Sequence, residues 1–150
     1  MKNEELMIRE LKDDFDNLEN SLATLEFSLG HCREIGLKDK YEDMDLVMFE
    51  SLTARFSRSS DIYTQKIVKG IVFLLRENAV TFIDRANLFE KLDISAAEDL
   101  KLIRDLRNEI SHEYRSSDIE GTFEAVMEYS DKLLEIIEKT KVFLLERKIL

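Results

Sequence analysis

The chain has 150 residues, no proline and four glycines, whereas average usage gives roughly ten glycines and about seven prolines at this length. Hydrophobic residues make up 44% of the chain and charged residues 36%, which excludes an intrinsically disordered protein despite the net charge of −10. Tight turns between strands need glycine and proline, so the composition also excludes a β-sandwich or barrel and predicts an all-α protein. We expect residues 1–150 to form a single-domain, up-and-down helical bundle of four to five helices.

A hydrophobic stripe with alternating steps of three and four residues predicts a long amphipathic helix over about residues 3–29. Its members are Ile8, Leu11, Phe15, Leu18, Leu22, Leu25 and Leu29. We expect Gly30 to end this helix and Gly36 to lie in the connection that follows. Residues 1–50 hold fourteen acidic and six basic side chains, and we interpret this acidity as a solvated helix face.

A second long helix is predicted over about residues 42–78, and it carries the only clear basic stripe of the chain. Its apolar face is formed by Phe49, Leu52, Phe56, Tyr63, Ile67, Ile71 and Leu74. At ~100° per residue, five basic side chains fall within an arc of roughly 80° beside that face. They are Arg55, Arg58, Lys66, Lys69 and Arg76, and Asp61 is the only acidic residue among them.

Three further helices are predicted in the second half of the chain. A short one covers about residues 80–92. The next begins at a capping box formed by Ser95 and Glu98 and ends near Ile110. A second capping box, formed by Ser117 and Glu120, opens the last helix, which continues to the C-terminus.

Several kinds of site are excluded by residue counts. The single Cys32 excludes a disulfide framework, and His31 and His112 are too few for a Cys/His zinc site. We therefore expect no metal and no cofactor. The chain begins with polar, acidic residues and has no apolar run near the ~20 residues needed to span a bilayer. These features predict a cytoplasmic protein without a membrane partner.

The end of the fourth predicted helix carries a guanidinium, an amide, an imidazole and a phenol close together, at Arg107, Asn108, His112 and Tyr114. Asn108 and His112 are four residues apart and share a helix face, whereas Arg107 and His112 point ~140° apart on an ideal helix. If the helix frays near Ser111, the four groups converge. Histidine can move a proton near neutral pH, and arginine can hold a phosphate with two hydrogen bonds. Together they are suited to metal-independent RNA cleavage.

A structural interpretation stands beside this catalytic one. Arg107 then pairs with Asp105 or Glu113 at the surface, and His112 caps the C-terminus of a helix, where the macrodipole favours a cation. Tyr114 is then a packing aromatic in a loop.

The segment from Arg107 to Tyr114 resembles the signature of HEPN domains, specifically of HepT-like toxins, in which an arginine with a polar neighbour precedes a histidine and a tyrosine. An upstream element also resembles one HepT-like branch, with the residues Arg55, Phe56, Arg58 and Asp61. The segment from Leu88–Leu92 through the capped fourth helix resembles the same HepT-like branch. The similarity covers about residues 45–145.

The resemblance implies a HEPN bundle that forms a homodimer, with the Arg107–Tyr114 segments of both copies near the twofold axis. It implies catalytic Arg107 and His112 and a supporting Asn108. From the basic stripe we expect RNA contacts by Arg55, Arg58, Lys66 and Lys69. The resemblance also implies an antitoxin of the minimal nucleotidyltransferase (MNT) type, which neutralises the toxin by transferring AMP to Tyr114. The expected function is therefore a toxin–antitoxin endoribonuclease.

Two alternatives remain open at this point. The first is a non-catalytic HEPN subunit that binds substrate or nucleotide for its nucleotidyltransferase. A ribonuclease needs the basic stripe near Arg107 and His112, whereas a binding subunit can pair or bury it elsewhere. The second is a structural helical adaptor in which the first helix provides a coiled-coil seam, and Arg107 and His112 lie apart.

Overall fold

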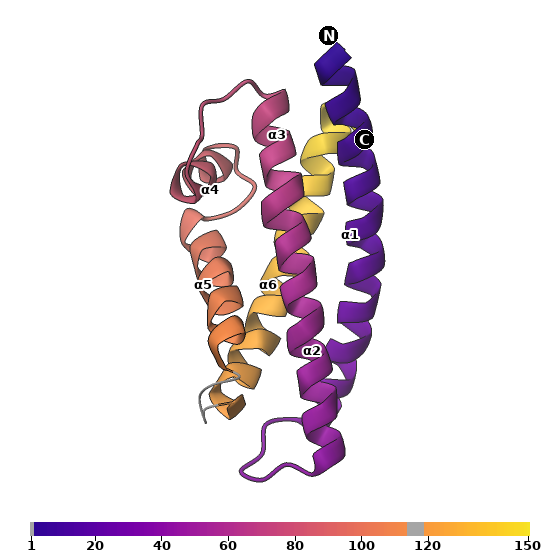
Figure 1. Cartoon of the computed structure of the whole chain (residues 1–150), viewed down its shortest axis with the longest axis vertical. Coiled ribbons are helices and arrows are strands. Elements are labelled where there is room, and N and C mark those ends of the chain that lie inside the picture. The colour runs from indigo at the N-terminus through magenta and orange to yellow at the C-terminus, as the bar shows by residue number, and fades with distance from the viewer. Residues whose placement is uncertain (1, 114–118) are drawn as a thin grey trace.

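The computed structural model describes residues 2–113 and 119–150, and within these ranges it is a helical bundle without strands, as predicted (Figure 1). Its elements are α1 (Lys2–Ile35), α2 (Asp43–Ile62), the π-helical segment η1 (Tyr63–Ile67), α3 (Val68–Leu74), α4 (Phe82–Lys91), α5 (Ala97–Glu113) and α6 (Ile119–Glu146). None of the helices in these ranges is both long enough and apolar enough to cross a membrane.

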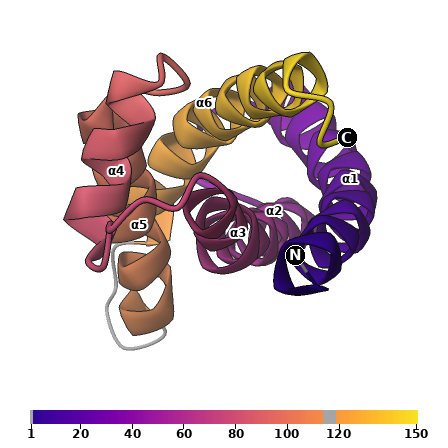
Figure 2. The ribbon, with the colours of Figure 1, turned by 90° about the horizontal axis from the view of Figure 1, so that it is seen from above.

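The elements α2, η1 and α3 form one continuous helix that lies in the middle of the bundle. Figure 2 shows α1 on one side of it and α5 on the other, with α6 completing the ring, and α2 contacts all three. Most of the predicted apolar face is buried, including Phe49, Phe56, Tyr63 and Ile67. This helix ends at Leu74 rather than near Asn78, because the chain turns through a positive φ of 56° at Arg76.

Buried hydroxyl groups fix the central helix against its neighbours. The hydroxyl of Thr140 on α6 donates to the Ile136 carbonyl at 2.7 Å, so its oxygen accepts the hydrogen bond from the Tyr63 hydroxyl at 2.8 Å. Burial raises the pKa of Tyr63, which keeps this phenol a neutral donor. A hydrogen bond of 2.7 Å joins the buried hydroxyls of Ser21 on α1 and Ser59 on α2. Each contact satisfies a polar group that would be costly to leave unpaired in the core.

The hydrophobic stripe of α1 packs inside the chain's own bundle. Leu11, Phe15, Leu18, Leu25 and Leu29 are all at most 3% exposed. A coiled-coil seam for another protein, as the adaptor alternative requires, is therefore not available on this face of α1.

The first helix does not end at Gly30 as predicted, but continues to Ile35. A glycine inside a helix costs about 1 kcal/mol relative to alanine, and burial of Leu29 and Cys32 on either side of Gly30 outweighs that cost. Gly36 ends the helix instead, with a φ of 72° and a hydrogen bond of 2.9 Å from its amide to the Cys32 carbonyl. This left-handed conformation is the usual one for a glycine after a helix C-terminus.

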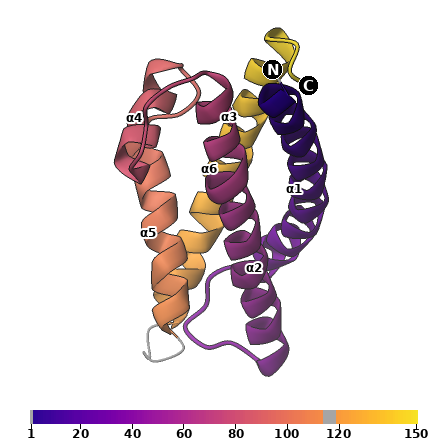
Figure 3. The same ribbon diagram turned by 45° about the horizontal axis from the view of Figure 1, so that its top comes forward.

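Helix α4 packs on α5 at the end of the bundle where both chain termini lie (Figure 3). It begins with a capping box between Thr81 and Asp84. The predicted box of Ser95 and Glu98 is wrong, because the Ser95 hydroxyl donates to the Ala96 carbonyl at 3.0 Å. The first amide of α5 donates instead to the Glu90 carboxylate of α4 at 3.2 Å. Helix α5 also continues to Glu113, beyond the predicted end, and the predicted box at Ser117 lies outside the described residues.

Substitution by alanine should change the stability of the protein in opposite directions at Gly30 and at Gly36, the two glycines near the end of α1. A Cβ atom at either position meets nothing within 4 Å, so only backbone conformation distinguishes them. We expect Gly36→Ala to lower the free energy of unfolding by about 1 kcal/mol, because alanine is strained at positive φ. Gly30→Ala should raise the free energy of unfolding by about 1 kcal/mol through helix propensity. Urea unfolding of both variants checks this, and a stabilised Gly36→Ala protein would contradict the assigned helix end.

Candidate functional site on helices α2 and α5

Arg107, which the sequence analysis assigned to catalysis, is held by a carboxylate from the central helix. Its Nε donates to Asp61 Oδ1 at 2.9 Å and its Nη2 donates to Asp61 Oδ2 at 3.0 Å. The two side chains are 29% and 46% exposed, respectively. Hydrogen bonding to Asp61 raises the pKa of Arg107 above its already high value, so the guanidinium stays charged at any physiological pH. The site therefore contains a fixed, charged pair at the border of the core.

Helical geometry explains why Asp61 faces α5. Asp61 follows Arg55 by six residues, which places it ~120° away around the helix axis. Arg55 contacts α1, through hydrogen bonds from its Nη1 to the Thr24 carbonyl at 3.2 Å and to Ser28 Oγ at 2.6 Å. The central helix thus presents a cation to α1 and an anion to α5.

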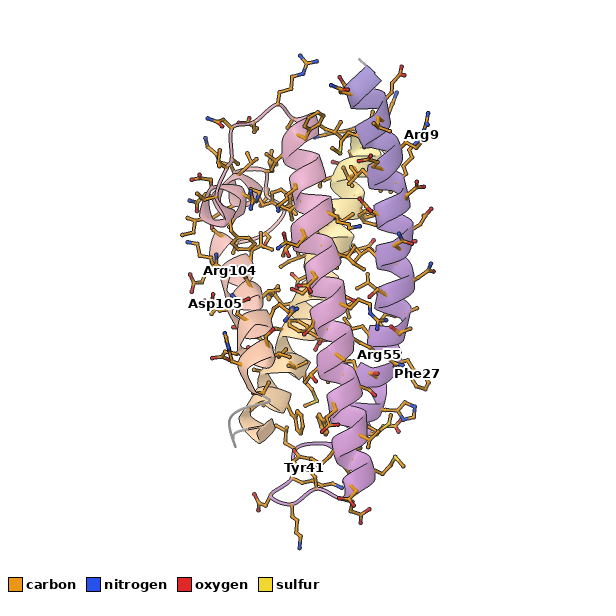
Figure 4. All side chains as sticks on the ribbon, viewed as in Figure 1. Arg9, Phe27, Tyr41, Arg55, Arg104 and Asp105 are labelled. Atoms are coloured by element: carbon orange, nitrogen blue, oxygen red, sulfur yellow. The ribbon has the colours of Figure 1, made fainter. Side chains whose placement is uncertain are left out.

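The partner of Arg107 differs from both surface partners that the structural interpretation named. Asp105 pairs with Arg104 at 3.3 Å, and Figure 4 shows these two side chains on the side of α5 away from the central helix. Asp61 was not among the predicted site residues. The available signal was its position, since it is the single acidic residue in a basic segment and part of the upstream element that resembles HepT-like proteins.

The last turns of α5 are helical through Glu113, so the fraying near Ser111 that would bring the four groups together does not occur. Arg107 Nη1 donates to Ser111 Oγ, and the Ser111 hydroxyl lies 3.5 Å from the Arg107 carbonyl. With the helix intact, Arg107 and His112 point ~140° apart within one chain. Asn108 and His112 are both exposed and share a face of α5 that differs from the face of Arg107. Tyr114 lies outside the described residues.

Most of the predicted RNA contacts have partners within the chain. Arg55 of α2 is hydrogen bonded to α1, and its side chain lies between α1 and α2 (Figure 4). Lys66 lies 3.8 Å from Asp14 of α1, and Lys69 donates to Gln65 at 3.0 Å. Arg76, in the same stripe, pairs with Glu4 of α1 at 3.5 Å. The acidity of the first third of the chain is thus partly matched by the basic stripe, and is not only a solvated face.

Arg58 is the exception among these basic residues. It is exposed, and among the residues that the structure describes it has no polar partner. It precedes Asp61 by three residues, so the two positions lie ~60° apart around the central helix. Arg58 is therefore the predicted RNA contact whose charge is available beside the Asp61–Arg107 pair.

Other reactive groups lie away from this site or are inert. Cys32 is buried, its thiol donates to the Met48 carbonyl at 3.4 Å, and burial raises its pKa to about 11. The thiol is consequently protonated and a poor nucleophile at neutral pH. Within residues 2–113 and 119–150, no three His, Cys, Asp or Glu side chains are grouped so that they could hold a metal ion.

Comparisons with protein-family models, with curated proteins and with solved structures found no match to this chain. The arrangement of Asp61, Arg107 and His112 therefore has to be interpreted from its own chemistry together with the motif resemblance.

The Asp61–Arg107 contact should appear as an energetic coupling. In a double-mutant cycle with Asp61→Ala and Arg107→Ala, we expect about 0.5–1 kcal/mol of coupling in the free energy of unfolding. The pair is bidentate, but solvent screens it because both side chains are partly exposed. The matched control is Arg104 and Asp105, an exposed pair on the same helix, whose coupling should be near zero. Equal coupling in both cycles, measured by urea unfolding, would contradict the structural role given to Asp61.

Proposed function

We propose that this protein is a HepT-like HEPN toxin, a metal-independent endoribonuclease that acts as a homodimer. The observation that carries the proposal is the bidentate contact between Asp61 and Arg107. The contact joins the two sequence elements, 46 residues apart, on which the resemblance to HepT-like proteins rests. It fixes the arginine of the motif on the same helix that carries the exposed His112.

The proposed chemistry uses the 2′-hydroxyl of RNA as the nucleophile. The 2′-oxygen attacks the adjacent phosphorus and His112 of one copy accepts the 2′-proton. The P–O5′ bond breaks, and His112 of the second copy donates a proton to the leaving 5′-oxygen. Arg107 stabilises the negative charge that develops on the phosphorane. The products are a 2′,3′-cyclic phosphate and a 5′-hydroxyl, and no metal ion or redox partner takes part.

A homodimer resolves the separation of the two catalytic groups within one chain. Arg107 and His112 of one α5 helix point ~140° apart, so they do not serve a single phosphate well. An isologous interface places the same segment of a second copy opposite the first. The exposed face with Asn108 and His112 is then the face that meets the partner copy. In this arrangement Asn108 supports the site, and the exposed Arg58, which has no polar partner among the described residues, contacts the RNA backbone.

We propose further that an MNT-type nucleotidyltransferase neutralises the toxin by transferring AMP to Tyr114. An AMP group on that phenol adds bulk and a negative phosphodiester two residues after His112, where it repels the RNA backbone.

The non-catalytic HEPN subunit remains the second candidate because of the basic stripe. Arg55, Lys66 and Arg76 contact α1, and within residues 2–113 and 119–150 Arg58 is the member of the stripe without a polar partner. Such pairing favours a subunit that presents nucleotide or substrate to an enzyme, since it leaves little positive charge for RNA binding. The two candidates differ in whether His112 is needed for a reaction.

Substitution of the two histidines decides between these candidates. We expect His112→Ala to abolish RNA cleavage in the presence of EDTA, because removal of a general acid–base group costs about 100-fold or more. His31→Ala is the matched control: it removes the other exposed histidine, whose ring contacts Phe27 of α1 at a tilt of 57°, and it should cleave like the wild type.

Electrophoresis of a labelled RNA, with helicity checked by circular dichroism, provides the measurement. Cleavage by the wild type that survives His112→Ala but disappears with EDTA would contradict the mechanism. A wild-type protein that binds its nucleotidyltransferase but cleaves no RNA would favour the binding subunit.

A further inference from the structure

The guanidinium of Arg107 is held from two sides by its own chain. A guanidinium has five N–H donors arranged along its edges. Asp61 accepts from Nε and Nη2, which together form one edge. On the other side, Ser111 accepts from Nη1. Three of the five donors are thus committed to groups that belong to α2 and α5.

Among the residues that the structure describes, two donors of Arg107 remain without an acceptor, one on Nη1 and one on Nη2. Each of these nitrogens carries two hydrogens, so each retains one N–H after the contacts with Ser111 and Asp61. Two parallel N–H groups match two oxygens of one phosphate. Because 29% of the Arg107 side chain is exposed, the guanidinium is not closed off by the core.

The charge of Asp61 sets a second property of this site. The Asp61–Arg107 pair is neutral overall, so it attracts a distant polyanion less than a free arginine does. The affinity of this site for a phosphate therefore comes from directed hydrogen bonds more than from net charge. The carboxylate also repels further negative charge, which favours a monoanionic phosphodiester over a dianionic terminal phosphate.

We propose that Asp61 and Ser111 are positioning residues, which fix Arg107 so that one edge of its guanidinium is presented to a single phosphodiester. This inference rests on the proposed ribonuclease function. It adds that Asp61 lowers the affinity for RNA while raising the rate of the chemical step. A residue of purely structural importance would not separate these two effects.

The test replaces Asp61 with asparagine in the full-length chain. Asp61→Asn keeps the size of the side chain, removes its charge and leaves one acceptor for the two Arg107 donors. We expect kcat to fall about tenfold or more, as misplacement of a group by fractions of an ångström does. We expect equal or tighter binding of a 2′-deoxy oligonucleotide, which cannot be cleaved, with a steeper salt dependence. Asp61→Glu restores the charge and should recover part of kcat.

Asp105→Asn is the matched control, because it changes the net charge of the protein by the same amount but affects the outward pair with Arg104 on α5. It should retain the kcat of the wild type. A higher kcat in Asp61→Asn would show that Asp61 blocks the site, and would overturn the proposal. Equal kcat values for Asp61→Asn and Asp105→Asn would overturn it as well.

A nuclear magnetic resonance measurement keeps the inference separate from catalysis. The Arg107 Nε–H signal, identified by its loss in Arg107→Lys, should exchange slowly with water in the wild type and in Asp105→Asn, but rapidly in Asp61→Asn. Addition of the 2′-deoxy oligonucleotide should shift this signal in the wild type. If the wild type cleaves no RNA, the proposed function fails, and the positioning proposal is then judged by this shift alone. Absence of the shift would overturn it.

Discussion

The bundle depends on the central helix formed by α2, η1 and α3, because it contacts three different neighbours, α1, α5 and α6. Arg55 binds α1, the buried Tyr63 hydroxyl binds α6, and Asp61 binds Arg107 of α5. Apolar burial sets which face of the helix turns toward the core, and these directional polar contacts fix its rotation about its axis more closely. The rotation so fixed brings the motif of α5 against an acidic side chain rather than a basic one.

Much of the fold could be predicted from local patterns. The scarcity of glycine and proline indicated helices, and the periodicity of the apolar residues identified Leu11, Phe56 and Ile67 as core residues. Helix ends were less predictable. A glycine such as Gly30 is typical of a helix end, but burial of its neighbours favours continuation of α1 to Ile35. The start of α5 is capped by Glu90, which belongs to another helix. Such contacts depend on tertiary structure, so a local pattern does not reveal them.

The candidate site was predictable only in part, for a similar reason. The motif singled out Arg107 and His112, but the partner of Arg107 lies 46 residues away, and nearby Asp105 and Glu113 seemed equally suitable in sequence. The basic stripe was visible, whereas its pairing with acidic residues of α1 required knowledge of how the helices pack. Because Arg55, Lys66 and Arg76 contact α1, the proposed ribonuclease would rely on a narrow set of groups, Arg58, Arg107 and His112, and not on the whole stripe. This restriction makes a second copy of the chain central to the account.

The most direct test of that dependence is a subunit-mixing experiment. A fixed amount of wild-type protein is allowed to exchange subunits with increasing amounts of His112→Ala protein, mixed dimers are verified by native mass spectrometry, and RNA cleavage is measured in EDTA. If two copies complete one site, each mixed dimer lacks a required group, and wild-type activity falls as inactive chain is added. Unchanged wild-type activity while mixed dimers form would mean that one chain holds a complete site, and would contradict the account.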